Sequence, residues 1–455
     1  MNTKALRQKI LDLAIHGKLV PQDPNDEPAS VLLEHIRAEK ERLIKEGKIK
    51  KPKKSKAACD KPHYPFELPN GWKWCYIIDV TNKITDGTHN SPINTPKGDF
   101  KYITAKNIKA HGIELNNISY VSKNIHNEIY ARCNPEKGDI LYIKDGATTG
   151  VVTLNNLDEQ FSLLSSVALI KPNKNISNKY LLYYLQSPLC YDSVRGSMKG
   201  VGITRITLKQ IEKWELPLPP LSEQERIVCQ IENWLSLIDT IEKGKENISI
   251  ALKQAKSKIL DLAIHGKLVP QDPNDEPARE LLKRINPKAE ITCDNPHYQN
   301  LPKGWAICSL ENIIEYEQPT AYIVNSTDYD DSYLTPVLTA GKSFIIGHTN
   351  ETNGIYTNLP CIIFDDFTTD SKLVDFPFKV KSSAMKILQV KEEISIEYVA
   401  MFMSITRLIS DTHKRYWISE YSKINIPIPP KDEQCRIVET VHIMFTKLDK
   451  ISESL

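Results

Sequence analysis

The segment KILDLAIHGKLVPQDPNDEPA at residues 9–29 decides the fold, because it returns without a single change at residues 258–278. Its apolar residues have helical spacing, and the His-Gly-Lys that follows them supplies a cationic last turn and a glycine stop for a helix. A solenoid is excluded, since its period would be about 20–50 residues. The repeat therefore indicates one module that is used twice.

Two further blocks accompany this segment in the same order in both copies. The motif LPxGW occurs at residues 68–72 and 301–305, each time shortly after Pro-His-Tyr. A third block reads LPLPPLSEQERIV at residues 216–228 and IPIPPKDEQCRIV at residues 426–438. Between LPxGW and the third block the two copies show little likeness. The repeated module therefore carries two different inserts.

The third block predicts the start of a helix. The pair Pro219–Pro220 blocks a helix before it, and Ser222 with Glu225 predicts a capping box. In the second copy Asp432 is the predicted cap, without the box, because Cys435 stands where the glutamate would be. Both helices are expected to begin directly after the prolines.

Apolar residues in this helix follow a coiled-coil pattern. Over Ile227–Leu262 they alternate at spacings of four and three, and only Lys245 interrupts the pattern. The second copy covers Ile437–Leu455 and stops, while its missing half stands at residues 1–15. We predict two long antiparallel coiled-coil helices, one continuous and one built from both chain ends, in a circularly permuted pseudo-two-fold repeat with neighbouring termini. The alternative is an amphipathic helix on a larger core.

Each insert shows short apolar and β-branched runs separated by Gly, Asn and Asp, with a helical run just before the third block. These patterns predict two mixed, strand-rich α/β domains. The predicted strands are Trp74–Ile78, Asp139–Ile143, Val151–Leu154, Ser166–Ile170, Tyr333–Leu338, Cys361–Phe364 and Met385–Val390, and the predicted helices are Lys179–Gln186 and Ile396–Ser404.

The repeat and the inserts divide the chain into five segments. The Lys-rich stretch Lys45–Lys56 occurs once, before the first insert, and either touches a DNA backbone or is a solvated linker. The predicted segments are an N-terminal half of a helical region with this linker (1–57), the first insert domain (58–218), a central helical region (219–290), the second insert domain (291–429) and a C-terminal helix that pairs with the central one (430–455).

The composition is that of an ordinary globular protein. Lys and Arg total 59 against 57 Asp and Glu, and a net charge of +2 neither indicates nor excludes a nucleic-acid partner. The N-terminus lacks the apolar core of a signal peptide, and no apolar run approaches the roughly 20 residues that cross a bilayer. The nine cysteines are scattered without a C-x-x-C pair, which predicts neither disulfides nor a zinc site. We expect a cytoplasmic protein.

Sequence motifs of catalysis are missing. The chain has no G-x-x-x-x-G-K-[ST] loop, no H-E-x-x-H and no G-x-S-x-G. It also lacks the Asn-Pro-Pro-aromatic or Asp-Pro-Pro-Tyr tetrapeptide with which amino-methyltransferases hold the target amine. The adjacent Asp365 and Asp366 are interpreted as a solvated turn. We therefore expect no catalytic residue, no metal and no cofactor in this chain.

Two different insert domains, called heads below, on a rigid spacer fit a DNA-recognition protein better than an enzyme. They predict an asymmetric DNA site whose two halves are separated by a gap that is not recognised. Amide, hydroxyl and Lys side chains contact base edges and phosphates, although they are also ordinary loop formers. Residues 60–215 include 19 basic and 15 acidic residues, whereas residues 295–430 include 11 and 16, an awkward balance for phosphate binding unless the basic residues share one face. The candidate DNA-binding residues are Thr88, His89, Asn90, Lys106, Asn107, Lys144, Thr148 and Lys199 in the first insert and Lys342, Lys372, His413, Lys414 and Arg415 in the second.

The helical blocks, the LPxGW starts and the unlike inserts together resemble the specificity subunit of type I restriction–modification enzymes over essentially the whole chain. The resemblance implies two target recognition domains held apart by two helical regions, and no catalytic activity in this subunit. It also implies two modification subunits that methylate adenine with S-adenosylmethionine, and restriction subunits that translocate and cleave DNA with ATP and Mg. Half of one helical region stands at the N-terminus, unlike the commonest layout of the family, which leaves open which end closes the repeat.

The repeated polar loop predicts a docking surface for a partner. A helix needs likeness only at buried positions, yet residues 21–27 return unchanged at residues 270–276. Equal surfaces suggest two copies of one partner, consistent with two modification subunits, although a recent duplication or gene conversion would give the same identity. The candidate partner-binding residues are Gln22, Asp23, Asp26, Gln271, Asp272 and Asp275.

Two other functions compete with DNA recognition. The acidic second insert permits a coiled-coil adaptor whose two heads bind proteins. A self-sufficient methyltransferase or nuclease is disfavoured by the missing motifs. Binding to random duplex across a salt series separates the DNA reader from the adaptor, and methyl transfer by the chain alone tests the third function.

Overall fold

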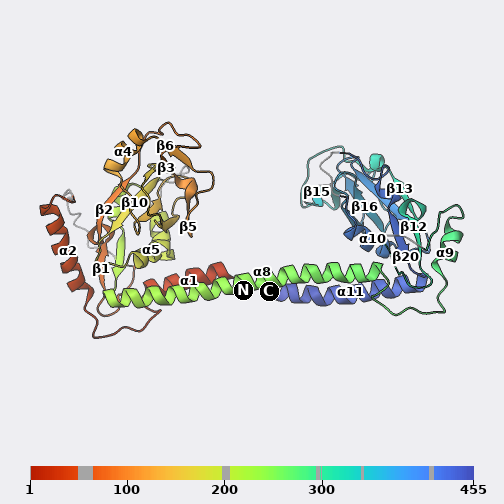
Figure 1. The fold of residues 1–455 in the computed structure, drawn as a ribbon, viewed down its shortest axis with the longest axis horizontal. Helices are drawn as coiled ribbons and strands as arrows, with labels where there is room; N and C mark the ends of the chain where they lie inside the picture. Colours follow the sequence, from red (N-terminus) through yellow and green to blue (C-terminus); the bar gives the residue numbers. More distant parts are fainter. Residues whose placement is uncertain are drawn as a thin grey trace. The chain divides into compact units, whose positions relative to one another are not determined.

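Two compact units make up the chain, Met1–Lys243 and Gly244–Leu455. In the computed structural model each unit contains both helices and strands (Figure 1). Within the described part of the chain, no helix is long and apolar enough to cross a membrane. The structure describes residues 2–49, 65–196, 205–293, 298, 300–339, 343–408 and 414–455.

Two helices lie side by side in the first unit. Helix α1 (Thr3–Ile15) packs along the first part of α8 (Leu221–Ile264), as Figure 1 shows. Arg7, near the beginning of α1, pairs with Asp239 and Glu242, while the loop after α1 contacts the first turn of α8. The two helices are therefore antiparallel.

The second unit contains a comparable pair. Helix α11 (Lys431–Ser454) packs along the last part of α8. Lys256 forms an ion pair with Asp449 and lies 4.9 Å from the centre of the Phe445 ring, while the loop after α8 contacts the first turn of α11. These two helices are antiparallel as well.

Both long helices begin at a proline, and the predicted caps are wrong. The carbonyl oxygen of Pro220 accepts a hydrogen bond from the backbone N–H of Gln224 at 2.9 Å, and α11 begins after Pro430 without a side-chain cap. A residue in the cap position needs only its carbonyl group for the first helical bond, so proline is tolerated there. Ser222 and Asp432 consequently lie inside the first turn.

The predicted glycine stops are confirmed. Helix α1 ends at Ile15 and α8 at Ile264, and Gly17 and Gly266 follow with φ of 65° and 64°. A Cβ atom at Gly17 would lie 2.4 Å from Pro69, a residue of the LPxGW motif, and one at Gly266 would lie 2.3 Å from Pro302. Only glycine fits this left-handed turn against the proline.

A short strand pair closes the insert of the first unit. Strand β1 (Lys73–Tyr76) runs antiparallel to β11 (Glu215–Leu218). The strand predicted for Trp74–Ile78 ends earlier, because Ile77–Val80 form the helix α3. Strand β11 was not predicted, because Pro217 within it is untypical of a strand. The repeated LPxGW motif and third block thus lie next to each other.

The main sheet of the first unit has four antiparallel strands in the order β2-β10-β7-β8. A second sheet has the order β6-β3-β9, and β4 pairs with β5. The elements are α2 (Ala29–Lys45), β2 (Thr81–Asp86), β3 (Phe100–Ile103), β4 (Ile108–Lys109), β5 (Gly112–Ile113), β6 (Ser119–Val121), α4 (Lys123–Arg132), β7 (Ile140–Ile143), β8 (Val152–Leu154), β9 (Phe161–Leu163), β10 (Val167–Pro172), α5 (Asn178–Gln186), α6 (Pro188–Gly196) and α7 (Leu208–Glu212).

Strand β7 shows why this sheet is stable. Its side chains alternate between two cores: Ile140 and Tyr142 pack in the core that includes α1, α2 and α5, whereas Leu141 and Ile143 pack with Phe161 on the other face. All are buried, and burial of such a side chain contributes about 1.5–3 kcal/mol. The sheet is therefore a central layer covered on both faces.

The second unit repeats this plan with other residues. Its closing pair is β12-β20, its main sheet has the order β13-β19-β16-β17, and a second sheet has the order β15-β14-β18. The elements are α9 (Ala278–Ile285), β12 (Ala306–Ser309), β13 (Ile314–Glu317), β14 (Thr335–Leu338), β15 (Ile345–Thr349), β16 (Cys361–Asp365), β17 (Ser371–Val374), β18 (Lys379–Val380), β19 (Met385–Val390), α10 (Ile396–Ile405) and β20 (Asn425–Ile428).

The predicted mixed, strand-rich fold is confirmed. Strand β19 has the predicted bounds, and α5 and α10 differ from the predicted helices by one residue at one end. The five segment boundaries and the pseudo-two-fold arrangement stay predictions.

Candidate nucleic-acid interface

One end of the main sheet in the first unit gathers charged side chains, and we name it the first loop end. Asp86 is the last residue of β2 and Lys144 directly follows β7, and the strand register places both beside the start of β10. The other end of β10 leads to Ser177, whose backbone N–H donates to Oε1 of Gln224 at 3.0 Å in the first turn of α8. The first loop end is thus opposite the end of the sheet that contacts the helices.

Asp86 organises the first loop end. Its carboxylate is buried, and it forms ion pairs with Arg132 and, at 3.5 Å, with Lys144. His89 Nε2 lies 3.4 Å from Asp86 and 3.1 Å from Arg132 Nη2. Lys144 is 2% exposed and also pairs with Asp145 at 2.8 Å. A buried carboxylate is tolerable only with such partners, so this network is held in one arrangement.

The structure brings several candidate DNA-binding residues to the first loop end. His89 and Asn90 are exposed, and Thr88 is half-buried with its hydroxyl donating to the Asn90 carbonyl oxygen at 3.0 Å. Thr148 is exposed in the loop between β7 and β8. Lys144 belongs to the same network but is buried, so it supports the loop rather than meeting a ligand.

The other candidates of the first insert lie elsewhere. Lys106 is exposed on a 3-10 turn after β3. Asn107 is buried, its Oδ1 accepts from the backbone N–H of Thr104, and its Nδ2 donates to the carbonyl oxygen of Glu114 at 3.2 Å. These hydrogen bonds occupy the Asn107 amide group inside the domain, so Asn107 has a structural role. Lys199 lies outside the described residues.

The equivalent end of the second unit, the second loop end, also contains a buried ion pair. Asp366 follows β16 and lies 3.5 Å from Lys386 of β19, and both are almost fully buried. The backbone N–H of Trp417 donates to Asp366 at 2.8 Å. Asp365 is buried too and accepts from the hydroxyl of Thr368 at 2.6 Å. The interpretation of this aspartate pair as a solvated turn is wrong, because both carboxylates find partners inside the unit.

Lys386 titrates differently from an exposed lysine. Burial lowers its pKa from the usual 10.5, and the nearby charge of Arg415 lowers it further, whereas Asp366 opposes the shift. Burial therefore disfavours the charged form of Lys386, and Asp366 favours it.

Two lysine candidates of the second insert are exposed and already have a partner. Lys372 is on β17, with Nζ 4.3 Å from the centre of the Phe344 ring. Lys414 forms an ion pair with Glu420. Exposed pairs of this kind are weak, so both lysines can still meet a ligand.

Arg415 is a candidate whose charge acts on the buried pair of the second loop end. It is exposed, and its Nη2 lies 3.5 Å from the hydroxyl oxygen of Ser383, which is a weak hydrogen bond. Its charge acts on Lys386, as the pKa shift shows. Lys342 and His413 lie outside the described residues.

Sequence reasoning missed two arginines at the first loop end. Arg132 is the last residue of α4, where a basic residue is ordinary, and its partner Asp86 is far away in sequence. Arg205 forms an isolated bridge with Asp145, and its Nε lies 3.4 Å from that carboxylate. Only the fold brings these pairs together, so no sequence signal could have found them.

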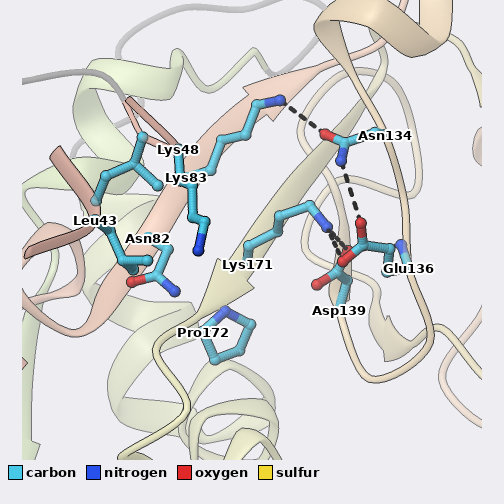
Figure 2. A pocket seen from close by; sticks show the side chains of 10 residues that line it. Leu43, Lys48, Asn82, Lys83, Asn134, Glu136, Asp139, Lys171 and Pro172 are labelled. Atoms are coloured by element: carbon cyan, nitrogen blue, oxygen red, sulfur yellow. Dashed lines mark hydrogen bonds and ion pairs between the residues drawn. The ribbon is translucent and has the colours of Figure 1, made fainter. Parts of the chain in front are cut away.

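A pocket of about 450 Å³ lies at the opposite end of the main sheet of the first unit (Figure 2). Lys171 Nζ pairs with Asp139 at 2.8 Å and with Glu136 at 3.0 Å, and Lys83 donates to Asn134 at 2.8 Å. Since these groups engage one another, the pocket is a poor site for a charged ligand. Its lining residues are Leu43, Lys48, Ile49, Asn82, Lys83, Asn134, Glu136, Asp139, Lys171 and Pro172.

The repeated blocks meet in a set of contacts that we name the first joint. Glu223, in the first turn of α8, accepts a hydrogen bond from Trp72 Nε1 at 2.9 Å and one from Gln22 Nε2 at 3.2 Å. Arg226 pairs with Asp26 at 2.6 Å. Glu223 is 1% exposed, and burial raises its pKa above 4.5, although the two hydrogen bonds oppose this.

The second joint has the same contacts. Glu433 accepts from Trp305 Nε1 at 3.0 Å and from Gln271 Nε2 at 2.9 Å. Arg436 pairs with Asp275 at 2.6 Å. Burial likewise raises the pKa of Glu433. The first two repeated blocks thus bind the third in both units.

These joints bear on the candidate partner-binding residues. Gln22 and Asp26 have partners inside their own unit, as do Gln271 and Asp275. These internal contacts are a second explanation, besides partner docking, for the identical sequence of the two loops. Asp23 and Asp272 are exposed, and each accepts hydrogen bonds from the asparagine two residues later. Docking of a partner stays a prediction, and the exposed Asp23 and Asp272 can serve it without breaking a joint contact described above.

The described residues offer little to covalent or metal chemistry. No group of three or more His, Cys, Asp or Glu among them could hold a metal ion. Burial raises the pKa of several thiols to about 12, so these thiols are protonated at neutral pH and weak nucleophiles. They are Cys133, Cys190, Cys308 and Cys361.

Comparisons with known proteins identify the family of this chain. The family model of the type I restriction modification DNA specificity domain matches residues 69–250 and 302–454. The chain is 28% identical to the type I restriction enzyme EcoAI specificity subunit of Escherichia coli, over 99% of this chain and 86% of that one. It is also 51% identical to the Escherichia coli EcoR124I/EcoR124II specificity subunit, over 31% of this chain and 37% of that one.

The fold has a counterpart among solved structures. A chain from a study of complex assembly and conformational transition of the type I R-M system aligns with a TM-score of 0.59 at 16% identity, over 86% of this chain and 94% of that one. This likeness concerns the fold alone, whereas the family model covers most of the sequence. The chain belongs to the type I restriction–modification DNA specificity family.

Proposed function

We propose that this chain is the non-catalytic DNA-specificity subunit of a type I restriction–modification complex. Its target recognition domains, residues 58–218 and 291–429, each read one half of a bipartite, asymmetric DNA site. Two long antiparallel coiled-coil helices in a pseudo-two-fold arrangement hold the domains. The observation that carries the proposal is the pair of matching joints, each connecting a helix to a head with a different loop end.

The matched contacts support one mechanical role for both joints. Trp72 and Trp305 each tie the beginning of a head to a buried glutamate on a helix, at 2.9 Å and 3.0 Å. Buried, fully bonded polar groups fix an orientation, because any rotation would leave them without partners. Each head is therefore oriented by the helix that carries it, as a reader of DNA requires.

The complex supplies the chemistry through other subunits. Two modification subunits methylate adenine with S-adenosylmethionine, and restriction subunits use ATP and Mg to translocate and cleave DNA. We place these reactions in the cytoplasm, where the DNA is. The chain itself recognises the DNA sequence, and it needs neither cofactor nor metal for that role.

Mapping of methylated adenines across the genome tests the function. Cells with the modification subunits are compared with and without this gene. We expect a bipartite motif with two unlike halves and a fixed gap that is methylated only when the gene is present. An unchanged methylation map would contradict the proposal.

Binding of the purified complex to random duplex tests it against the adaptor function. A DNA reader binds random duplex through phosphates, and the affinity falls steeply as salt rises. An adaptor with protein-binding heads would show no such binding at low salt, which would contradict the proposal.

Partner docking is tested with Asp23→Lys and Asp272→Lys together. Hydrogen bonds from Asn25 lower the pKa of Asp23, so this exposed residue is charged at neutral pH. We expect co-purification with the modification subunits to fall. Asp23→Asn with Asp272→Asn is the matched control, because an amide oxygen can keep the turn. Undiminished co-purification of the lysine variant would contradict docking at this loop.

A further inference from the structure

Arg132 is held in place at the first loop end and yet faces solvent. Its Nη2 donates to the buried Asp86 and lies 3.1 Å from His89 Nε2, while about half of its side chain is exposed (51%). Both contacts use one nitrogen of a guanidinium group that has five N–H donors. Donors therefore remain for a ligand, in an orientation that the protein has already fixed.

The charges around Arg132 argue against a simple phosphate contact. Lys144 pairs with Asp86 and Asp145, and Arg205 pairs with Asp145 as well. Three basic groups thus share two carboxylates, which removes most of the net charge on which phosphate attraction depends. What remains is a set of oriented donors, and orientation matters for reading base edges rather than phosphates.

The side chains around Arg132 are also suited to hydrogen bonds with bases. Exposed or half-exposed hydroxyl and amide side chains of Thr88, Asn90 and Thr148 occupy the same end of the sheet. Such groups hydrogen-bond to base edges in the major groove. The first loop end combines one fixed arginine with several short polar side chains.

We propose that Arg132 is a specificity-determining residue that reads a guanine in the half-site bound by the first unit. It donates N–H groups to O6 and N7 of the base, the two neighbouring acceptors that guanine presents in the major groove. Asp86 is a positioning residue, because it acts through Arg132, and Lys144 in turn supports Asp86. The inference rests on the proposed function and adds to it one residue and one base.

The test uses the complete chain with its modification subunits, and duplexes that carry the bipartite site found by methylation mapping. Every base pair of both half-sites is replaced in turn, and the affinity of each duplex is measured. For Arg132→Lys, which keeps the charge but loses the guanidinium fork, we expect discrimination at one G·C pair to fall by about tenfold to a hundredfold. All other positions, including the whole second half-site, should keep their discrimination.

Two further variants sharpen the test. Asp86→Asn keeps Arg132 but weakens its support, so we expect a smaller loss at the same base pair. Lys137→Ala is the matched control, because Lys137 is an exposed basic residue next to the opposite end of the sheet, and its ion pair with Asp158 is exposed and therefore weak. It should leave every position unchanged.

Two results would overturn the inference. If Arg132→Lys kept all discrimination while Arg132→Ala weakened every duplex equally and reduced the salt dependence, Arg132 would be a phosphate contact. If neither variant changed binding, Arg132 would be structural only. Failure of the proposed function looks different, since the unaltered chain would then direct no bipartite methylation at all.

Discussion

The joints of the two units are nearly identical, whereas their loop ends are not. At the joints, corresponding distances between the tryptophan, glutamine and glutamate side chains differ by 0.1–0.3 Å, and both Arg–Asp pairs measure 2.6 Å. At the loop ends, the same sheet topology carries different chemistry. Identity is thus found where a head meets a helix, and divergence where a head faces outward.

The two buried ion pairs illustrate the divergence. In the first unit Asp86 ends β2 and Lys144 follows β7, whereas in the second Asp366 follows β16, the counterpart of β7, and Lys386 lies on β19. The carboxylate and the ammonium group therefore come from different strands of equivalent sheets. Two heads with one framework can consequently present different side chains to a ligand.

The largest effect is expected at the joints. Trp72→Ala removes a buried ring and one of the two hydrogen-bond donors to Glu223, so the free energy of unfolding of the first unit should fall by about 5 kcal/mol. Trp305→Ala should destabilise the second unit equally. Urea unfolding of the full chain, followed with a probe in each unit, measures both. Unequal losses, above about 1 kcal/mol apart, would break the equivalence of the joints.

The buried lysines should separate the two loop ends. Lys386→Met leaves Asp366 buried without its cation, and we expect a loss of about 3 kcal/mol. Lys144→Met should have a smaller effect, because Arg132 still pairs with Asp86 and Arg205 with Asp145. The same unfolding experiment checks this order. A greater loss for Lys144→Met would show that Arg132 does not support Asp86.

The smallest effect concerns pH. Burial raises the pKa of Glu223 and Glu433 in the folded chain above the unfolded value near 4.5, so folding favours their protonated form. Their contribution to stability is present below that pH and is lost as the pH rises through the raised pKa.

Glu223→Gln with Glu433→Gln isolates this pH dependence. Unfolding free energies of the variant and the unaltered chain are compared between about pH 4 and pH 7. The difference should change in favour of the variant as pH rises, because an amide does not ionise. A difference that is constant over this range would show that neither glutamate titrates differently in the folded state.

The sequence predicted the parts of this protein that depend on local patterns or on the repeat. The spacing of apolar residues indicated the long helices. Gly17 marked the end of α1 and Gly266 the end of α8. The caps at Ser222 and Asp432 were wrong because a proline carbonyl can begin a helix unaided. The strand β11 was missed because Pro217, in its middle, is untypical of strands.

The loop ends could not be predicted in the same way. Asn107 and Lys144 are residue types that often contact DNA, but both are buried. Asp365 and Asp366 were interpreted as a solvated turn, but they are buried too. Arg132 has no local signal, since its partner Asp86 is on a different element. Burial and pairing between distant residues follow from tertiary packing, which the periodicity of one sequence does not record.

The span of each joint has a consequence for the order of folding. Trp72 and Glu223 are separated by 151 residues and Trp305 and Glu433 by 128, so each bond closes a loop that contains a whole head. Loop closure of this length is unfavourable until the intervening chain is compact. During synthesis on the ribosome the bond must also wait for the glutamate to emerge. The joint therefore closes only after the head between its two residues has folded. In a truncated or misfolded head the tryptophan would stay exposed, where chaperones and proteases can bind it.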